Sequence, residues 1–343
     1  MNPTLKLLKV IGSPFIYEKS LDPFSEEEAF ELYSHAVKNR IPLLYLDSLY
    51  KRNKLFALKS TYCKQYARYF KIFDTMVQVS DFLSSLNVEH AIFKSIKPFP
   101  DASVDVDTLI FDLKGYEKAI RIFPTMGYKM LGYGPQSVTF FDLHGEVGID
   151  LYREIAVSWI IYLDKKNLKK YIVNVRLPND RYVNTLAPEA DLTAIIAHSL
   201  IKEQMYTLAE FYSILGYMKK MNMDEIENLA ALIKTNNLVT VAKSLISITL
   251  ALHTQAFGFV PEKLALLSRN LGRDVLEERR LERSSFETPH RYHFLMLARS
   301  LIDKLWDKKT RKSLATQGFE MLKISFAKNV FEQILDHITR ETY

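Results

Sequence analysis

Cysteine is almost absent from this sequence, which contains only Cys63 in 343 residues. A single thiol excludes an intramolecular disulfide, a cysteine-based zinc site and an iron–sulfur cluster, and it agrees with a reducing cytosol. We interpret Cys63 as a small buried apolar residue on a helix rather than as a reactive thiol. The sequence therefore offers no sulfur chemistry on which to base a function.

Long apolar runs are also missing. No window offers 18 uninterrupted apolar residues, and the most apolar segment, 245–260, contains His253 and Gln255. The apolar stretch within residues 1–15 is too short and too interrupted for a signal peptide. We therefore expect a soluble, cytoplasmic protein that does not associate with a membrane.

The excess of positive charge is mild. The chain has 46 Lys and Arg against 40 Asp and Glu, which gives a net charge of +6 and a pI near 9.0. This balance suits an anionic partner such as a nucleotide or RNA, but it does not select a function. With 48% hydrophobic residues, a chain of this length can form two or three packed units.

The first 86 residues have the pattern of helices. Ser25 is an N-cap residue followed by three glutamates, and apolar residues then recur at helical spacing. Five short β-rich segments follow, with one helical segment at 115–126 between the second and the third. The five are 88–95, 105–112, 127–131, 137–144 and 146–152. They predict a mixed sheet about five strands wide, in which 137–152 is a hairpin that turns near His144 and Gly145.

Helical periodicity returns after Ser158 and is interrupted by a β-like segment at 176–186. The expected helices are 188–221, 224–235, 238–256, 261–282, 290–306 and 314–340. The predicted fold class is α+β, with a small mixed sheet flanked by N-terminal and C-terminal helical regions. The expected division is into residues 1–86, 87–186 and 187–343.

Two carboxylates carry the strongest chemical signal. Asp105 and Asp107 lie two residues apart in an apolar strand, so their side chains point to the same face. Such a pair repels unless a cation lies between the carboxylates. A structural role is the alternative, since two aspartates at this spacing are common on strands.

A third carboxylate interrupts the apolar segment 146–152. Asp150 would complete a pair of magnesium sites if its strand lay next to the strand of Asp105 and Asp107. Two such ions, magnesium or manganese, can hold the attacking oxygen and the departing pyrophosphate of an in-line phosphoryl transfer. The three aspartates are therefore the predicted catalytic and metal-binding residues.

These residues resemble the signature of the DNA polymerase β-like nucleotidyltransferase superfamily. That signature is an apolar strand ending in Gly-Ser or Gly-Gly, then D-h-[DE]-h, then h-[DE]-h on a later strand. Ser95, the pair Asp105 and Asp107, and Asp150 fall at these places. The resemblance implies transfer of a nucleoside monophosphate from a nucleoside triphosphate to a hydroxyl acceptor, with Mg²⁺ as cofactor.

The resemblance extends to a less characterised branch of that superfamily, over about residues 25–215. An apolar "pLL" segment precedes an h-K-G strand in that branch, and 35–46 and 91–95 look like these features. The segment 186–200 looks like the helix, beginning with Pro-Glu and carrying a histidine, that follows the catalytic domain.

One departure concerns the phosphate-binding loop, because the family glycine is absent. Either Ser95 replaces it, or Ser95 is the family serine and Lys94 occupies the glycine position. A Cβ crowds the approach of backbone to the triphosphate. We expect Lys94 and Ser95 to bind nucleotide, with Lys94 or Lys97 as a cation near the β- and γ-phosphates.

Two further surfaces are candidates for binding. His198, Lys202 and Tyr206 are spaced by four residues within the expected helix 188–221, so we expect His198 and Lys202 to bind nucleotide; a packed histidine beside a surface lysine is the alternative. Residues 269–312 carry a net charge of +5 with interleaved aromatic residues, which predicts an RNA-binding surface or a solvated helical face.

The sequence thus predicts a metal-dependent nucleotidyltransferase. A catalytically inactive nucleotide- or RNA-binding relative of the same fold is the first alternative, and a helical protein-binding scaffold is the second. The acceptor (RNA, a small molecule or a protein hydroxyl), the preferred base and the oligomeric state do not follow from the residues.

Overall fold

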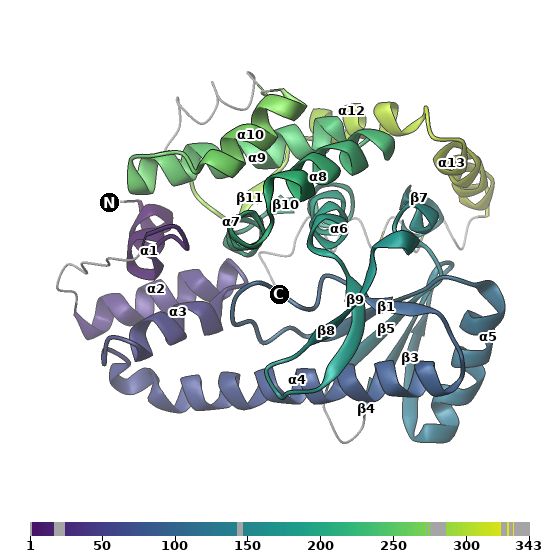
Figure 1. The fold of residues 1–343 in the computed structure, drawn as a ribbon, viewed down its shortest axis with the longest axis horizontal. Coiled ribbons are helices and arrows are strands. Elements are labelled where there is room, and N and C mark those ends of the chain that lie inside the picture. The colour runs from purple at the N-terminus through teal and green to yellow at the C-terminus, as the bar shows by residue number, and fades with distance from the viewer. Residues whose placement is uncertain are drawn as a thin grey trace.

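One seven-stranded sheet lies between two groups of helices (Figure 1). The computed structural model describes residues 2–16, 25–142, 147–272, 274 and 286–323, together with 328 and 332. The mixed sheet with helices on both sides confirms the α+β fold class. The division of the chain into three regions remains a prediction.

Helices precede the sheet in the described residues, in agreement with the helical pattern predicted for residues 1–86. They are α1 (Pro3–Ile11), α2 (Glu26–Lys38), α3 (Pro42–Tyr50) and α4 (Lys59–Ser85). At the start of α2, the Glu28 N–H donates to the Ser25 side chain and the Glu28 carboxylate accepts from the Ser25 N–H. Cys63 lies in the first half of α4 and is exposed, so the expectation that it is buried is wrong.

The sheet has the strand order β3-β4-β5-β2-β1-β9-β8. The five predicted segments give β1 (His90–Ile92), β2 (Asp105–Ile110), β3 (Tyr128–Tyr133), β4 (Ser137–Asp142) and β5 (Gly148–Tyr152). The sheet is wider than predicted because β8 (Ile172–Arg176) and β9 (Tyr182–Leu186) extend it beyond β1. Strands β4 and β5 pair antiparallel as expected, while the predicted turn near His144 and Gly145 lies outside the described residues.

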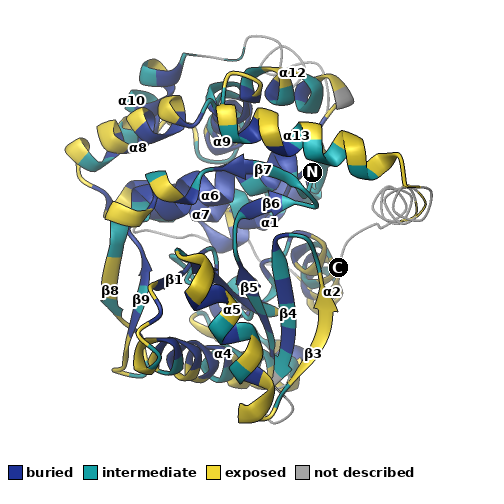
Figure 2. Ribbon diagram, turned by 90° about the vertical axis from the view of Figure 1, so that its right-hand side faces the viewer, coloured by how far each residue is buried: buried dark blue, intermediate teal, exposed yellow. Residues whose placement is uncertain are grey.

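The two faces of the sheet pack against different helices. Val106, Ile149 and Leu151 point to the face covered by α4 and α5 (Leu113–Ile122). Leu109 and Tyr152 point to the opposite face, which packs against the C-terminal helices. The alternation of a strand therefore separates the carboxylates from the α4 face. Figure 2 shows β3 as the exposed edge of the sheet.

Several predicted elements after β2 need correction. The helix expected at 115–126 ends at Ile122 and continues as a 3-10 turn, Phe123–Met126. The helical pattern predicted after Ser158 begins later than expected. Strands β6 (Ile155–Val157) and β7 (Ile160–Leu163) form a small hairpin that turns at Ser158. The β-like segment predicted at 176–186 contains β9, but its partner β8 begins earlier, at Ile172.

The C-terminal region is helical, but two predicted helices are divided. Its elements are α6 (Pro188–Ile201), β10 (Met205–Tyr206), α7 (Leu208–Lys220), α8 (Met223–Thr235), α9 (Val239–Phe257), α10 (Glu262–Leu271), β11 (His290–Arg291), α12 (Phe294–Lys304) and α13 (Lys308–Met321). The helix predicted at 188–221 is α6, β10 and α7, and the one predicted at 290–306 begins with β11. The helices predicted at 224–235 and 238–256 are confirmed. Much of 261–282 and 314–340 lies outside the described residues.

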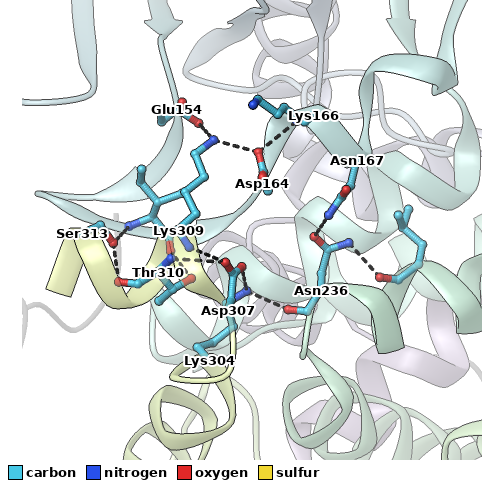
Figure 3. A network of polar contacts seen from close by, with 12 residues as sticks. Glu154, Asp164, Lys166, Asn167, Asn236, Lys304, Asp307, Lys309, Thr310 and Ser313 are labelled. Atoms are coloured by element: carbon cyan, nitrogen blue, oxygen red, sulfur yellow. Dashed lines mark hydrogen bonds and ion pairs between the residues drawn. The ribbon is translucent and has the colours of Figure 1, made fainter.

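A polar network holds α12 and α13 to the rest of the molecule (Figure 3). The buried Lys304 ammonium donates to the Asn236 carbonyl at 2.7 Å and pairs with Asp307 at 3.2 Å. Lys309 pairs with Glu154 and Asp164, both at 2.7 Å. Because Asn236 ends α8, and Glu154 and Asp164 flank the β6–β7 hairpin, these contacts join three parts of the chain.

The N-terminal helix contacts a segment near the other end of the sequence. Asn2 Nδ2 donates to the Phe286 carbonyl at 2.7 Å, and the Thr288 N–H donates to Thr4 Oγ1 at 2.9 Å. Asn39 Nδ2 also donates to the Thr288 carbonyl at 3.1 Å. Residues 286–288 therefore connect α1 to the end of α2 through hydrogen bonds. In the described part of the chain, no helix has the length and apolar character needed to cross a membrane.

Candidate functional site

Two parallel strands position the three predicted aspartates. Asp107 of β2 is the register partner of Asp150 in β5, and Asp105 is opposite Gly148. Neighbouring strands are about 4.8 Å apart, so Asp107 and Asp150 are close, and Asp105 lies on the same face by its spacing of two. A Cβ at Gly148 would lie 3.2 Å from the Asp105 Cβ, so glycine there leaves room for Asp105. The structure thus brings together all three carboxylates.

Burial and mutual repulsion shift the acidity of this cluster. Burial raises the pKa of Asp105 to about 7, and the charges of Asp107 and Asp150 contribute to that rise. Burial and Asp107 likewise raise the pKa of Asp150. Burial acts in the same direction on Asp107, but Lys94, Lys202 and His198 together lower its pKa below the ordinary value. The cluster therefore attracts protons or cations.

Lys94 supplies the nearest positive charge. Its ammonium lies 3.2 Å from Asp107 Oδ2, and 4.8 Å and 5.4 Å from the ring centroids of Phe93 and Tyr152. Its backbone has φ of +61°, in the left-handed region that favours glycine, and its N–H donates to Asp191 Oδ1 at 2.7 Å. Lys94 thus has a backbone conformation that glycine adopts more readily than lysine.

Ser95 is fixed by its neighbours. Its hydroxyl donates to the Phe93 carbonyl at 3.2 Å and accepts from the Asp107 N–H at 2.9 Å, and the residue is buried. These bonds link the end of β1 to the middle of β2. The side chain therefore shapes the loop beside Asp107 and has little freedom to bind phosphate.

His198 and Lys202 also reach the site, although the predicted stripe does not exist. Helix α6 ends at Ile201, and Tyr206 lies in β10, where its hydroxyl bonds to Thr249 Oγ1 at 2.8 Å. The His198 Nδ1 lies 3.1 Å from the Tyr162 hydroxyl and 3.4 Å from Lys94 Nζ. Lys202 Nζ lies 3.4 Å from the Tyr152 hydroxyl. Burial, then Lys94, lowers the pKa of His198 to about 3, so the ring is neutral near pH 7.

Several residues that the sequence pattern did not single out support these groups. Asp191 accepts bonds from the Lys94 N–H and from the Tyr217 hydroxyl, the latter at 2.6 Å, and burial raises its pKa to about 6. Glu203 Oε1 lies 3.2 Å from His198 Nε2, where it accepts a hydrogen bond from the neutral ring, and Glu203 pairs with Arg40 at 2.7 Å. Asp191 interrupts an apolar helix as Asp150 interrupts an apolar strand, so the same argument would have found it.

The donor set suits magnesium in its chemistry, since carboxylate oxygens are the ligands that this ion prefers. Two of the three carboxylates, however, already have partners within the protein. Asp107 faces the Lys94 ammonium, and Asp150 accepts bonds from Thr139 Oγ1 at 2.6 Å and the Tyr152 hydroxyl at 3.3 Å. Within residues 2–16, 25–142, 147–272 and 286–323, no three His, Cys, Asp or Glu side chains converge as metal ligands do. A metal ion would have to displace the Lys94 ammonium from Asp107.

No protein-family model and no curated protein matches this chain.

The predicted RNA surface at 269–312 is only partly open. Residues 273 and 275–285 lie outside the described part, and Phe286 and Tyr292 are buried. Lys304 is buried and Lys309 is held in two ion pairs. Phe286 and Tyr292 are therefore unavailable for stacking on bases.

Proposed function

We propose that this chain is a metal-dependent nucleotidyltransferase, which transfers a nucleoside monophosphate from a nucleoside triphosphate to a hydroxyl acceptor and releases pyrophosphate. The pairing of Asp107 with Asp150 across parallel strands, with Asp105 on the same face, carries the proposal. The raised pKa of Asp105 supports it, since acidic groups forced together are the expected design of a cation site.

Each aspartate has a separate role in this proposal. Asp105 and Asp107 would hold Mg²⁺ or Mn²⁺, and Asp150 would share one ion. Bound there, these ions supply charge stabilisation at the attacking and leaving oxygens. Asp150 accepts the proton of the acceptor hydroxyl. The hydroxyl oxygen of the acceptor then bonds to the α-phosphorus, and the bond from that phosphorus to pyrophosphate breaks. The raised pKa of Asp150 brings its basicity closer to neutral pH.

The basic residues bind the nucleotide. Lys94 neutralises Asp107 before substrate arrives, and its ammonium then turns to the β- and γ-phosphates. Lys202 adds a second positive charge. The neutral His198 ring accepts a hydrogen bond from the Lys94 ammonium and does not repel it. Because the Ser95 hydroxyl is engaged within the loop, its part in phosphate binding falls to the backbone N–H.

One observation favours a second candidate, an inactive nucleotide- or RNA-binding relative of the same fold. The ion pair between Lys94 and Asp107 places a permanent cation on the carboxylate pair. A protein of this kind would bind a nucleotide or RNA without turning over.

Incubation with labelled nucleoside triphosphates, total RNA and Mg²⁺ or Mn²⁺ separates the two candidates. We expect incorporation and pyrophosphate release by the parent and neither by Asp105→Asn. Asp180→Asn is the matched control, because Asp180 is an exposed aspartate in the β8–β9 turn. Absence of release in the parent, or equal release in Asp105→Asn, would overturn the enzyme proposal.

A further inference from the structure

A second basic surface lies outside the segment that composition singled out. Residues 48–73 contain seven Lys and Arg and no Asp or Glu, an excess larger than the +6 of the whole chain. The seven are Lys51, Arg52, Lys54, Lys59, Lys64, Arg68 and Lys71. Among the acidic groups close to this surface, Asp47 pairs with Lys51 at 2.6 Å, Asp101 pairs with Lys97 at 2.9 Å, and Glu26 Oε1 accepts from the Ala57 N–H at 3.2 Å. The surface therefore keeps an excess of positive charge.

This surface is mostly the first half of α4. Helix α4 extends past the strands, so that its first half lies beneath α2 and α3 rather than beneath the sheet (Figure 1). None of its first thirteen residues is buried, and its buried residues begin at Ile72. Lys59, Lys64 and Lys71 form no ion pair within the described part of the chain. Core packing alone does not explain this exposed half-helix.

Aromatic rings in contact with one another run along the same surface. The Tyr50 and Tyr62 rings stack with centroids 4.9 Å apart and an interplanar angle of 18°. Tyr66 follows at 5.5 Å from Tyr62, and Phe70 at 5.2 Å from Tyr66. Tyr50 is 55% exposed and Tyr66 is 39% exposed, so both residues are accessible to solvent. We name residues 50–71 the aromatic–basic strip.

One end of the strip contacts the loop that leads into β2. Arg68 Nε donates to the Ser103 carbonyl at 3.3 Å, two residues before Asp105. Tyr69 lies next to Phe73 at 4.6 Å and is close enough to Asp101 for that carboxylate to contribute to raising its pKa. A chain bound along the strip would therefore approach the loop that precedes the three aspartates.

We propose that the aromatic–basic strip binds single-stranded RNA and that this RNA is the acceptor whose hydroxyl reaches Asp105, Asp107 and Asp150. Lysines and arginines at this density neutralise phosphates, and exposed rings stack on unpaired bases. Four of the rings are tyrosines, whose hydroxyls can bond to the 2′-hydroxyl, and this favours RNA over DNA. The acceptor role rests on the proposed function, whereas the binding role does not.

Fluorescence anisotropy with a labelled single-stranded oligoribonucleotide tests the binding role. The assay is run in EDTA with the full chain and with Asp105→Asn, so that it is independent of turnover. We expect Tyr66→Ala to weaken binding by about 5- to 150-fold, the range for losing one stacked base. We expect Lys59→Ala/Lys64→Ala to reduce the salt slope by about 0.7 for each phosphate that the protein no longer neutralises.

Matched changes in and beside α12 and α13 are the controls. Trp306→Ala removes an exposed ring and Lys308→Ala/Lys312→Ala removes two exposed lysines, all within the segment 269–312. Both should bind RNA as the parent does. Equal weakening by strip and control variants, no RNA binding by the parent, or tighter binding of the same sequence as DNA would each overturn the inference.

The acceptor role has its own test. In the incorporation assay, Tyr66→Ala should raise KM for the RNA and leave KM for the nucleotide unchanged. If the parent binds RNA through the strip but incorporates nothing, the proposed function fails and the binding site stands. If the parent labels RNA with a KM that Tyr66→Ala does not change, the strip is not the acceptor site.

Discussion

Replacing Asp105 by asparagine should stabilise the protein above neutral pH, although Asp105 is proposed to be essential for activity. Burial, together with Asp107 and Asp150, raises the pKa of Asp105 from 3.8 to about 7. The folded protein therefore holds this proton more tightly than the unfolded chain. The stability that the proton contributes is complete below about pH 4 and is lost as the pH rises through about 7.

The magnitude follows from the size of the shift. About three pKa units at about 1.4 kcal/mol each give an upper bound of about 4 kcal/mol, lost between acidic and mildly alkaline pH. Asparagine is uncharged at every pH and has nearly the same volume. Asp105→Asn should therefore unfold like the parent at about pH 4 and several degrees higher at about pH 8.

Thermal unfolding at the two pH values, followed by circular dichroism in EDTA, measures this difference. Asp180→Asn is the control, since its exposed pair with Arg176 contributes little to stability. It should follow the parent at both pH values. If Asp105→Asn melts at or below the parent temperature at about pH 8, Asp105 is not repelled by its neighbours, and the reasoning is wrong.

Three further substitutions test the surroundings of the site. Lys94→Met should destabilise the protein by about 3–5 kcal/mol, because it leaves Asp107 buried without its cation; adding Asp107→Asn should recover part of this in urea unfolding. Gly216→Ala should lower both stability and incorporation, because a Cβ there would lie 2.6 Å from Pro98 Cγ in the loop before β2. The expected cost of about 1–3 kcal/mol exceeds the gain of about 1 kcal/mol in helix propensity. Lys304→Met should also cost about 3–5 kcal/mol by removing a buried ammonium, with protease sensitivity of α12 and α13 as the measurement.

The aspartate cluster could be predicted because its geometry is local. Spacing by two fixes the face of Asp105 and Asp107 once their segment is a strand, and a polar residue inside an apolar strand marks Asp150. The pairing of β2 with β5 depends on tertiary structure. A carboxylate in an apolar strand nevertheless needs a polar site, and this need favoured a position of Asp150 beside Asp105 and Asp107. The ion pair of Lys94 with Asp107 could not be predicted, because it depends on the left-handed turn after β1.

The end of α6 shows where sequence reasoning failed. No glycine or proline lies between Ile201 and Thr207, so the helical pattern predicted a helix that continues through Tyr206. The chain nevertheless held a signal for a new helix: Thr207 and Glu210 form a capping box at the start of α7. The RNA surface at 269–312 stays a prediction, and composition does not reveal that two of its aromatic residues, Phe286 and Tyr292, are buried.

The contact of α1 with residues 286–288 has a consequence for synthesis on the ribosome. Asn2 and Phe286 are separated by 284 positions. At a synthesis rate of about 5–20 residues per second, Phe286 is therefore translated about 15–60 s after α1. During that interval the apolar face of α1, with Leu7 and Leu8, lacks part of its final cover. Chaperones that bind short apolar helices of nascent chains would therefore find their target here.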